Sequence, residues 1–235
     1  AISPNEKYIY AGNENADRLH SGGTETAICF SSTWGTYQLK NNQRSGGNHP
    51  CYTELDKTGQ WLFAGNYSSG TVGLLHVNTD GSLDSLSQLI KHSGSGPNLQ
   101  RQQSAHVHAT VISADNRYLF VPDLGMDKLV SYKFRNGRLG KCAEAVSLPG
   151  SGPRHLAFSP GQKFVYLMEE MSGMVVCYKL KRGKMKFVQR SNANLQHFTG
   201  ATGAADIHVS PDGNFLYCSN RGDANNIAIF SVDKK

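Results

Sequence analysis

Residues suited to acid–base and anion chemistry stand where short apolar runs begin. Histidine exchanges protons near neutral pH, and arginine binds carboxylates and phosphates through paired N–H donors. The residues at these starts are His49, His106, His108, Arg154, His155, Asp206 and His208. His106 and His108 would share one face of a strand, because side chains two apart in a strand point the same way.

A second polar set marks the ends of the strands that follow. Each member lies five positions after the aromatic residue that opens its strand: Asn13, Asn66, Asp123, Glu169 and Asn220. Glu170 and Arg221 come next in the chain. A carboxylate in such a place could act as a general base, and an arginine could hold an anionic group.

The spacing of these residues comes from an internal repeat. A turn phrase followed by an aromatic strand begins at Ser3, Asp56, Ser113, Ser159 and Ser210, at intervals of 53, 57, 46 and 51 residues. A period near 50 residues indicates one supersecondary unit used repeatedly. We place the repeats at about 1–47, 48–104, 105–151, 152–203 and 204–235.

Each repeat reads as four antiparallel strands joined by short turns. The predicted strands are 108–112, 118–121, 128–134 and 139–146 in the third copy, and 155–158, 164–168, 174–180 and 185–188 in the fourth. Helical periodicity is not sustained anywhere, and a β-sandwich would need no 50-residue repeat. Stacking such sheets around an axis buries both faces, so the predicted fold is an all-β propeller. We expect one partial propeller domain over 1–235, with about five blades and both ends cut inside a repeat.

Antiparallel pairing would bring the two polar sets together. The start of a blade's first strand lies beside the end of its second strand. If the first strands lie nearest the axis, these side chains face one central mouth. Histidines, arginines and carboxylates would then share a concave, partly desolvated place, where catalysis is expected.

Two structural alternatives apply to these residues. Asn after a strand often bonds its own turn, which would explain Asn13, Asn66 and Asn220 without a function. His106 and His108, with Asp123, could instead hold Zn²⁺. Two nearby arginines would repel a cation, so we predict no metal and no cofactor.

Composition argues against several other classes of protein. The net charge of +6 is scattered, and the lysines of 179–186 suit a solvated blade edge, so we predict no nucleic-acid partner. Excess positive charge is compatible with a small anionic substrate. No stretch is apolar enough for a membrane span, and five cysteines without a C-x-x-C pair favour buried thiols. We therefore expect a cytoplasmic protein without a membrane partner. The sequence leaves the oligomeric state open.

Specific phrases carry a family resemblance. They are Gly-Asn-Tyr-Ser-Ser-Gly at 65–70, Gly-Ser-Gly-Pro-Asn at 94–98, Ala-His-Val-His at 105–108, Val-Pro-Asp-Leu-Gly at 121–125, Gly-Pro-Arg-His at 152–155, Ile-His-Val-Ser-Pro-Asp-Gly at 207–213 and Ser-Asn-Arg-Gly at 219–222. The chain resembles the seven-bladed lactonase family, which includes the bacterial propeller-type 6-phosphogluconolactonases and the carboxy-cis,cis-muconate lactonizing enzyme. That resemblance implies a longer, seven-bladed ring.

The resemblance also implies an activity and a set of site residues. The implied reaction is hydrolysis of a sugar lactone, 6-phosphogluconolactone to 6-phosphogluconate, in the pentose phosphate pathway of glucose metabolism. The implied catalytic residues are His106, Arg154, Glu170 and Arg221. We expect the remaining polar residues to bind substrate: Asn66, Arg101, His108, Asp123, His155, Glu169, His208 and Asn220. The family usually has Asn where this chain has Glu169, which leaves open which adjacent carboxylate is poised.

Two other functions use the same fold. A lyase or cycloisomerase acting on a muconate-type acid would need the same base and arginines. A binding module without catalysis would need no converging His, Arg and Glu, but could display aromatic residues such as Trp34 and Tyr37.

Overall fold

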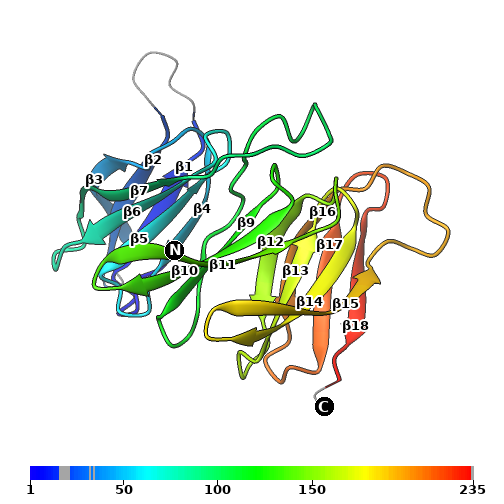
Figure 1. Ribbon diagram of the computed structural model, residues 1–235. Helices are drawn as coiled ribbons and strands as arrows, with labels where there is room; N and C mark the ends of the chain where they lie inside the picture. Colours follow the sequence, from blue (N-terminus) through cyan, green and yellow to red (C-terminus); the bar gives the residue numbers. More distant parts are fainter. Residues whose placement is uncertain (16–21, 32, 34, 234–235) are drawn as a thin grey trace. The chain divides into compact units, whose positions relative to one another are not determined.

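The computed structural model describes residues 1–15, 22–31, 33 and 35–233, so Trp34 lies outside the described residues. The described residues form eighteen β-strands in five antiparallel sheets and contain no helix (Figure 1). Nothing helical in these ranges could therefore span a lipid bilayer. The predicted all-β class is confirmed.

The chain forms two compact units. Unit 1 comprises Ala1–Ser93, Ala105–Val121 and Tyr132–Gly140, and unit 2 comprises Gly94–Ser104, Pro122–Ser131 and Lys141–Lys235. Each is described by itself below.

Unit 1 contains the first two sheets. The first has the order β1-β2-β3, with β1 at Tyr8–Asn13, β2 at Thr24–Ser31 and β3 at Thr36–Arg44. The second has the order β4-β5-β6-β7, with β4 at Pro50–Leu55, β5 at Trp61–Asn66, β6 at Thr71–Val77 and β7 at Leu83–Lys91. The two sheets pack through β1 against β4 and β3 against β7. Tyr10, Leu62 and Leu75 are fully buried in the core between them.

The third sheet has the order β11-β10-β9-β8, with β8 at Val111–Ile112, β9 at Tyr118–Asp123, β10 at Lys128–Arg135 and β11 at Arg138–Val146. Strand β8 is shorter than the predicted 108–112. His106 and His108 precede it, so the expectation that they share one face of a strand is wrong. This part of the chain is held by single contacts, described below, rather than by a ladder.

Unit 2 contains the fourth and fifth sheets. The fourth has the order β12-β13-β14-β15, with β12 at Pro153–Phe158, β13 at Phe164–Glu169, β14 at Met174–Lys181 and β15 at Lys184–Asn192. The fifth has the order β16-β17-β18, with β16 at Ala204–Val209, β17 at Phe215–Asn220 and β18 at Asn226–Ser231. Strand β16 packs against β12 and β13.

The repeated phrase is the turn in front of each aromatic strand. The side-chain oxygen of its first residue accepts the N–H of the aromatic residue in every copy: Ser3, Asp56, Ser113, Ser159 and Ser210. The fourth residue of each phrase has a positive φ: Glu6, Gly59, Asn116, Gln162 and Gly213. In the fourth copy the left-handed residue is therefore Gln162, with φ of 50°, and not the preceding glycine. The hydrogen bond to the side chain of the first residue stabilises the turn, including in the copies whose left-handed residue is not Gly.

The predicted pairing of strand starts with strand ends is confirmed. Pro50 pairs with Asn66, Pro153 with Glu169, and Ala204 with Asn220. The start of the first strand therefore lies beside the end of the second in each of these sheets, and the polar residues His49, Arg154 and Asp206 stand within two residues of these pairs.

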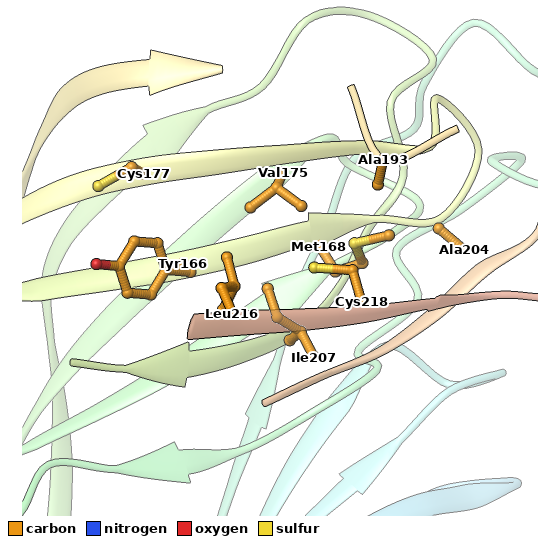
Figure 2. Packing of buried hydrophobic residues seen from close by; sticks show 9 residues of the cluster. All are labelled: Tyr166, Met168, Val175, Cys177, Ala193, Ala204, Ile207, Leu216 and Cys218. Carbon is orange, nitrogen blue, oxygen red and sulfur yellow. The ribbon is translucent and has the colours of Figure 1, made fainter. Parts of the chain in front are cut away.

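The core of unit 2 lies between the fourth and fifth sheets (Figure 2). Met168 and Cys218 are completely buried there, and Ile207 and Leu216 nearly so. Each aliphatic side chain buried this fully contributes about 1.5–3 kcal/mol to folding. Burial also raises the pKa of the Cys177 thiol to about 11 and that of Cys218 to about 12. None of the five cysteines forms a disulfide.

Candidate active site

Glu170 is the centre of a charged cluster in unit 2. Its Oε1 accepts a bond from Arg101 at 2.7 Å, its Oε2 accepts one from Arg154 at 2.9 Å, and Arg221 Nη2 lies 3.3 Å from Oε2. The side chain of Glu170 is 7% exposed and that of Arg154 is 14% exposed, whereas those of Arg101 and Arg221 are 45% and 54% exposed. Three positive charges around one carboxylate leave a positive excess that suits an anion.

The geometry of the fourth sheet places Arg154 opposite Glu170. The ladder between β12 and β13 shifts register between Pro153 and His155, so Arg154 is the extra residue of a β-bulge. Bulges re-aim side chains next to active sites. Glu170 has left β13, and its N–H donates to the carbonyl of Gly152 at 2.7 Å. The Nη1 of Arg154 also donates to a backbone carbonyl, that of Ala205, at 2.8 Å.

Arg101 and Arg221 reach Glu170 from loops. Arg101 lies between β7 and β8 in a turn closed by Asn98, whose Oδ1 accepts the N–H of Arg101 at 3.1 Å. Arg221 follows β17, and its backbone N–H donates to Gly203 at 2.9 Å. Both guanidinium groups keep about half of their surface in solvent, so they can contact a ligand while staying near Glu170.

A His-Asp-His chain lies beside this cluster in unit 2. Asp206 accepts from His155 Nδ1 and from His208 Nε2, each at 2.9 Å. Burial acts against the charge of Asp206, but these two hydrogen bonds, the N–H of Ile207 and the charge of His155 together lower the Asp206 pKa to about 2. Burial, and then the neighbouring charge of Arg154, lower the pKa of His155. The Nη1 of Arg154 is 3.3 Å from both ring nitrogens of His155, so the two predicted site residues are in contact.

The adjacent carboxylate, Glu169, has different partners from Glu170. It is completely buried, and its Oε2 accepts from Arg190 Nε at 3.0 Å, Arg190 Nη2 at 2.7 Å and Ser172 Oγ at 2.9 Å. Its Oε1 has no hydrogen-bond partner among the described residues. The structure thus separates the two glutamates, with Glu169 in an internal ion pair and Glu170 among the three arginines.

The polar residues that end the other strands bond to the backbone around them. Asn66 Nδ2 donates to the carbonyl of Ser45, Asn220 Nδ2 donates to the carbonyl of Ala193, and Asp123 Oδ1 accepts the N–H of Met126. These three side chains are buried. Asp123 bonds its own turn, whereas Asn66 and Asn220 donate to carbonyls 21 and 27 residues away in the chain. In their described bonds, the two asparagines therefore bind the backbone of distant segments and not, as the structural alternative expects, that of their own turns.

In unit 1, His106 is clamped against Tyr67. The His106 ring is 3% exposed and stacks on the Tyr67 ring at 4.5 Å, with 13° between the planes. Its Nδ1 lies 3.0 Å from the carbonyl oxygen of Tyr67, which can only accept, so Nδ1 carries the proton. In the neutral ring the basic lone pair is then on Nε2. His108 meets the edge of Tyr67 at 5.3 Å, and its Nδ1 lies 3.8 Å from Cys51 Sγ.

Sequence reasoning missed several residues that build these sites. Tyr67, which stacks on His106, and Arg190, which binds Glu169, were not expected as site residues, although Tyr67 directly follows a predicted site residue. Within the described ranges, no three His, Cys, Asp or Glu side chains gather closely enough to hold a metal ion.

Comparison with known proteins identifies the family. The sequence pattern of the family "Lactonase, 7-bladed beta-propeller" matches residues 1–235. A 6-phosphogluconolactonase of Formosa agariphila is 38% identical, covering 99% of this chain and 67% of the relative. A 6-phosphogluconolactonase of Bacillus subtilis is 34% identical, covering 98% and 67%.

A solved structure is also similar. The periplasmic gluconolactonase of Pseudomonas aeruginosa is 36% identical with a TM-score of 0.90, covering 99% of this chain and 67% of the other. The chain thus spans about two thirds of the length of these relatives. The resemblance predicted from the phrases is confirmed, and the chain belongs to the lactonase family of seven-bladed β-propellers.

Proposed function

We propose that the full-length protein is a lactonase that hydrolyses 6-phosphogluconolactone to 6-phosphogluconate. In this reaction, the oxygen of water attacks the ester carbonyl while a base takes its proton. The ring C–O bond then breaks, and a proton returns to the leaving oxygen. The names of the relatives from Formosa agariphila and Bacillus subtilis support this substrate.

The observation that carries the proposal is the bonding of Glu170 to three arginines. An ester carbonyl gains negative charge as water adds, and fixed N–H donors stabilise that charge, each by roughly 10²–10³-fold in rate. Arg154 is nearly buried and held by Glu170 and Ala205, so it suits the oxyanion. Arg101 and Arg221 are half exposed and suit a substrate phosphate.

In this assignment Glu170 orients the arginines. Glu170 accepts hydrogen bonds from Arg101 and Arg154 and forms an ion pair with Arg221, so its lone pairs are directed at the guanidinium groups. The family resemblance implies His106 as the general base, and the bond from its Nδ1 to the Tyr67 carbonyl is consistent with a neutral ring whose basic lone pair is on Nε2. Of the remaining predicted binding residues, His155 and His208, which lie beside the arginine cluster, would contact the sugar.

The experiment is a kinetic comparison on the full-length protein. We expect Arg154→Ala to lower kcat by about 10²–10³-fold towards 6-phosphogluconolactone. Arg101→Ala and Arg221→Ala should raise KM more for this substrate than for gluconolactone, which has no phosphate to bind. A wild-type rate for Arg154→Ala would contradict the proposal, and turnover of a muconate-type acid instead of the lactones would identify a cycloisomerase.

A cytoplasmic location is part of the proposal. It is supported by five cysteines without a disulfide and by the raised pKa values of the buried thiols Cys177 and Cys218. The relative from Pseudomonas aeruginosa is periplasmic. Fractionation of the source cells tests this location, and recovery of the protein outside the cytoplasm would overturn it.

A further inference from the structure

We infer that Asp127 is a positioning residue for the arginine cluster, an inference that rests on the proposed function. Asp127 lies in the turn between β9 and β10, in unit 2. Its side chain is buried, at 4% exposure for the whole residue, yet it touches none of the arginines in any described bond. Its φ is 53°, the left-handed conformation that Gly70 and Gly173 have at the equivalent turn positions of the second and fourth sheets.

Both carboxylate oxygens of Asp127 hold the turn that leads into β12. Oδ2 accepts the N–H of Gly150 at 2.7 Å, and Oδ1 accepts the N–H of Gly152 at 2.8 Å. The carbonyl of Gly152 in turn accepts the N–H of Glu170, and Arg154 lies two residues after Gly152. The bonds from Gly150 and Gly152 to Asp127 form the first arm of its hydrogen-bond network. This arm fixes the backbone that positions both Glu170 and Arg154.

The second arm holds the loop that carries Arg101. The Oδ1 of Asp127 also accepts from Nε2 of Gln102 at 2.8 Å, and the same Nε2 donates to the carbonyl of Leu124 at 2.8 Å. Gln102 is completely buried, and its Oε1 accepts the N–H of Asn98 at 3.2 Å. Arg101 precedes Gln102 directly in the chain. Anchoring Gln102 therefore fixes the backbone from which the Arg101 side chain extends.

Asp127 thus joins two loops that are distant in sequence and that supply opposite sides of the Glu170 carboxylate. Arg101 binds Oε1 and Arg154 binds Oε2. Three N–H donors converge on the Asp127 carboxylate, and only an acidic side chain can accept at both oxygens. Aspartate in this turn therefore sets the separation between Arg101 and Arg154.

The test is Asp127→Asn in the full-length protein, with Asp212→Asn as the matched control. Asn keeps the shape but turns one acceptor into a donor that faces buried N–H groups. Asp212 is exposed, and its Oδ1 accepts from Ser210 Oγ and from the N–H of Asn214 within its own turn, so the control makes the same chemical change at a residue whose described bonds join no distant loops. We expect Asp127→Asn to lower kcat/KM for 6-phosphogluconolactone by about 10–100-fold, the size of effect that a displacement of about 1 Å produces. Asp212→Asn should stay within about twofold of wild type.

The variant Gln102→Met tests the second arm by itself. It removes the side-chain amide that binds Asp127, and it leaves the bonds that the N–H groups of Gly150 and Gly152 donate to Asp127. It should raise KM with little change in kcat, whereas Asp127→Asn should change both. A shared loss of kcat in both variants, or wild-type kinetics for Asp127→Asn, would overturn the inference.

Hydrogen exchange provides a readout that does not depend on activity. In folded Asp127→Asn, we expect faster exchange at residues 96–102 and 150–152 only. A uniform increase over the whole of unit 2 would mean general destabilisation and would overturn the positioning role. If the wild-type protein fails to open the lactone, the proposed function fails, and the local exchange pattern still decides whether Asp127 holds the two loops.

Discussion

Replacing Glu170 by Gln tests the arginine cluster most directly. Gln has the same shape but one acceptor oxygen, so its amide nitrogen must face either Arg101, or Arg154 and Arg221. Breaking a buried ion pair by removing one partner costs about 3–5 kcal/mol. Since Arg101 and Arg221 are about half exposed and can hydrate, most of the loss comes from the nearly buried Arg154. We therefore expect a loss near the lower end, about 3 kcal/mol.

This loss has measurable consequences for stability and activity. About 3 kcal/mol corresponds to a fall in Tm of roughly 6–12 °C for a chain of this size. Displacement of Arg154 should also lower kcat/KM by on the order of 10²-fold at a temperature where the protein stays folded. Thermal unfolding and steady-state hydrolysis of 6-phosphogluconolactone measure the two effects separately.

The neighbouring variant Glu169→Gln distinguishes catalysis from stability. It makes the same chemical change on a fully buried residue whose partners are Arg190 and Ser172. We expect a similar fall in Tm but a much smaller loss of kcat/KM. Wild-type kcat/KM in folded Glu170→Gln, or equal kinetic losses in both variants, would refute the separate roles of the two glutamates.

Three further predictions use other parts of the chain. His106→Asn should lower kcat by about 10²–10⁴-fold if the imidazole is the base, and retained pH-dependent turnover would refute that assignment. The low Asp206 pKa of about 2 means that its charged form stabilises the fold above pH 4, and that this contribution is lost as pH falls from about 4 to about 2. Stability of Asp206→Asn, followed by urea unfolding, should therefore depend less on pH in that window. Cys177 and Cys218 should react with a thiol reagent only after unfolding, and rapid labelling of the native protein would contradict their burial.

The sequence was sufficient to predict the blades because every copy repeats the same local chemistry. The turn-closing Ser or Asp and the following aromatic residue appear in all five copies, so strand positions and the pairing of starts with ends followed directly. Asp127 and Arg190 could not be found this way. Their partners lie 25 and 21 residues away at Gln102 and Glu169, and no periodic signal marks such contacts. The prediction of a strand beginning at His108 was wrong because it relied on the repeat. The equivalent positions in other copies lie in a ladder, whereas β8 begins only at Val111.

The departure from the family pattern at Glu169 has a structural explanation. In three other blades the equivalent residue is Asn, and its Nδ2 donates to the first residue of the next strand in the chain: Asn13 to Thr24, Asn66 to Thr71, and Asn220 to Asn226. In the fourth blade that strand begins with Met174, which offers no comparable acceptor. A carboxylate at 169 needs donors instead, and Arg190 and Ser172 supply them.

In those three blades, an Asn binds a polar residue at the start of the next strand. In the fourth blade, the ion pair between Glu169 and Arg190 links two strands of the sheet instead. The pair ties β13 to β15, and Arg190 Nη2 also reaches Ser151 Oγ at 3.2 Å, next to the glycine whose carbonyl binds Glu170. The completely buried Glu169 is thus adjacent in the chain to Glu170, the carboxylate that contacts three arginines. Like charge at adjacent positions is tolerated because each glutamate has its own arginines: Arg190 for Glu169, and three others for Glu170. We therefore expect Glu170, rather than Glu169, to act in the proposed site.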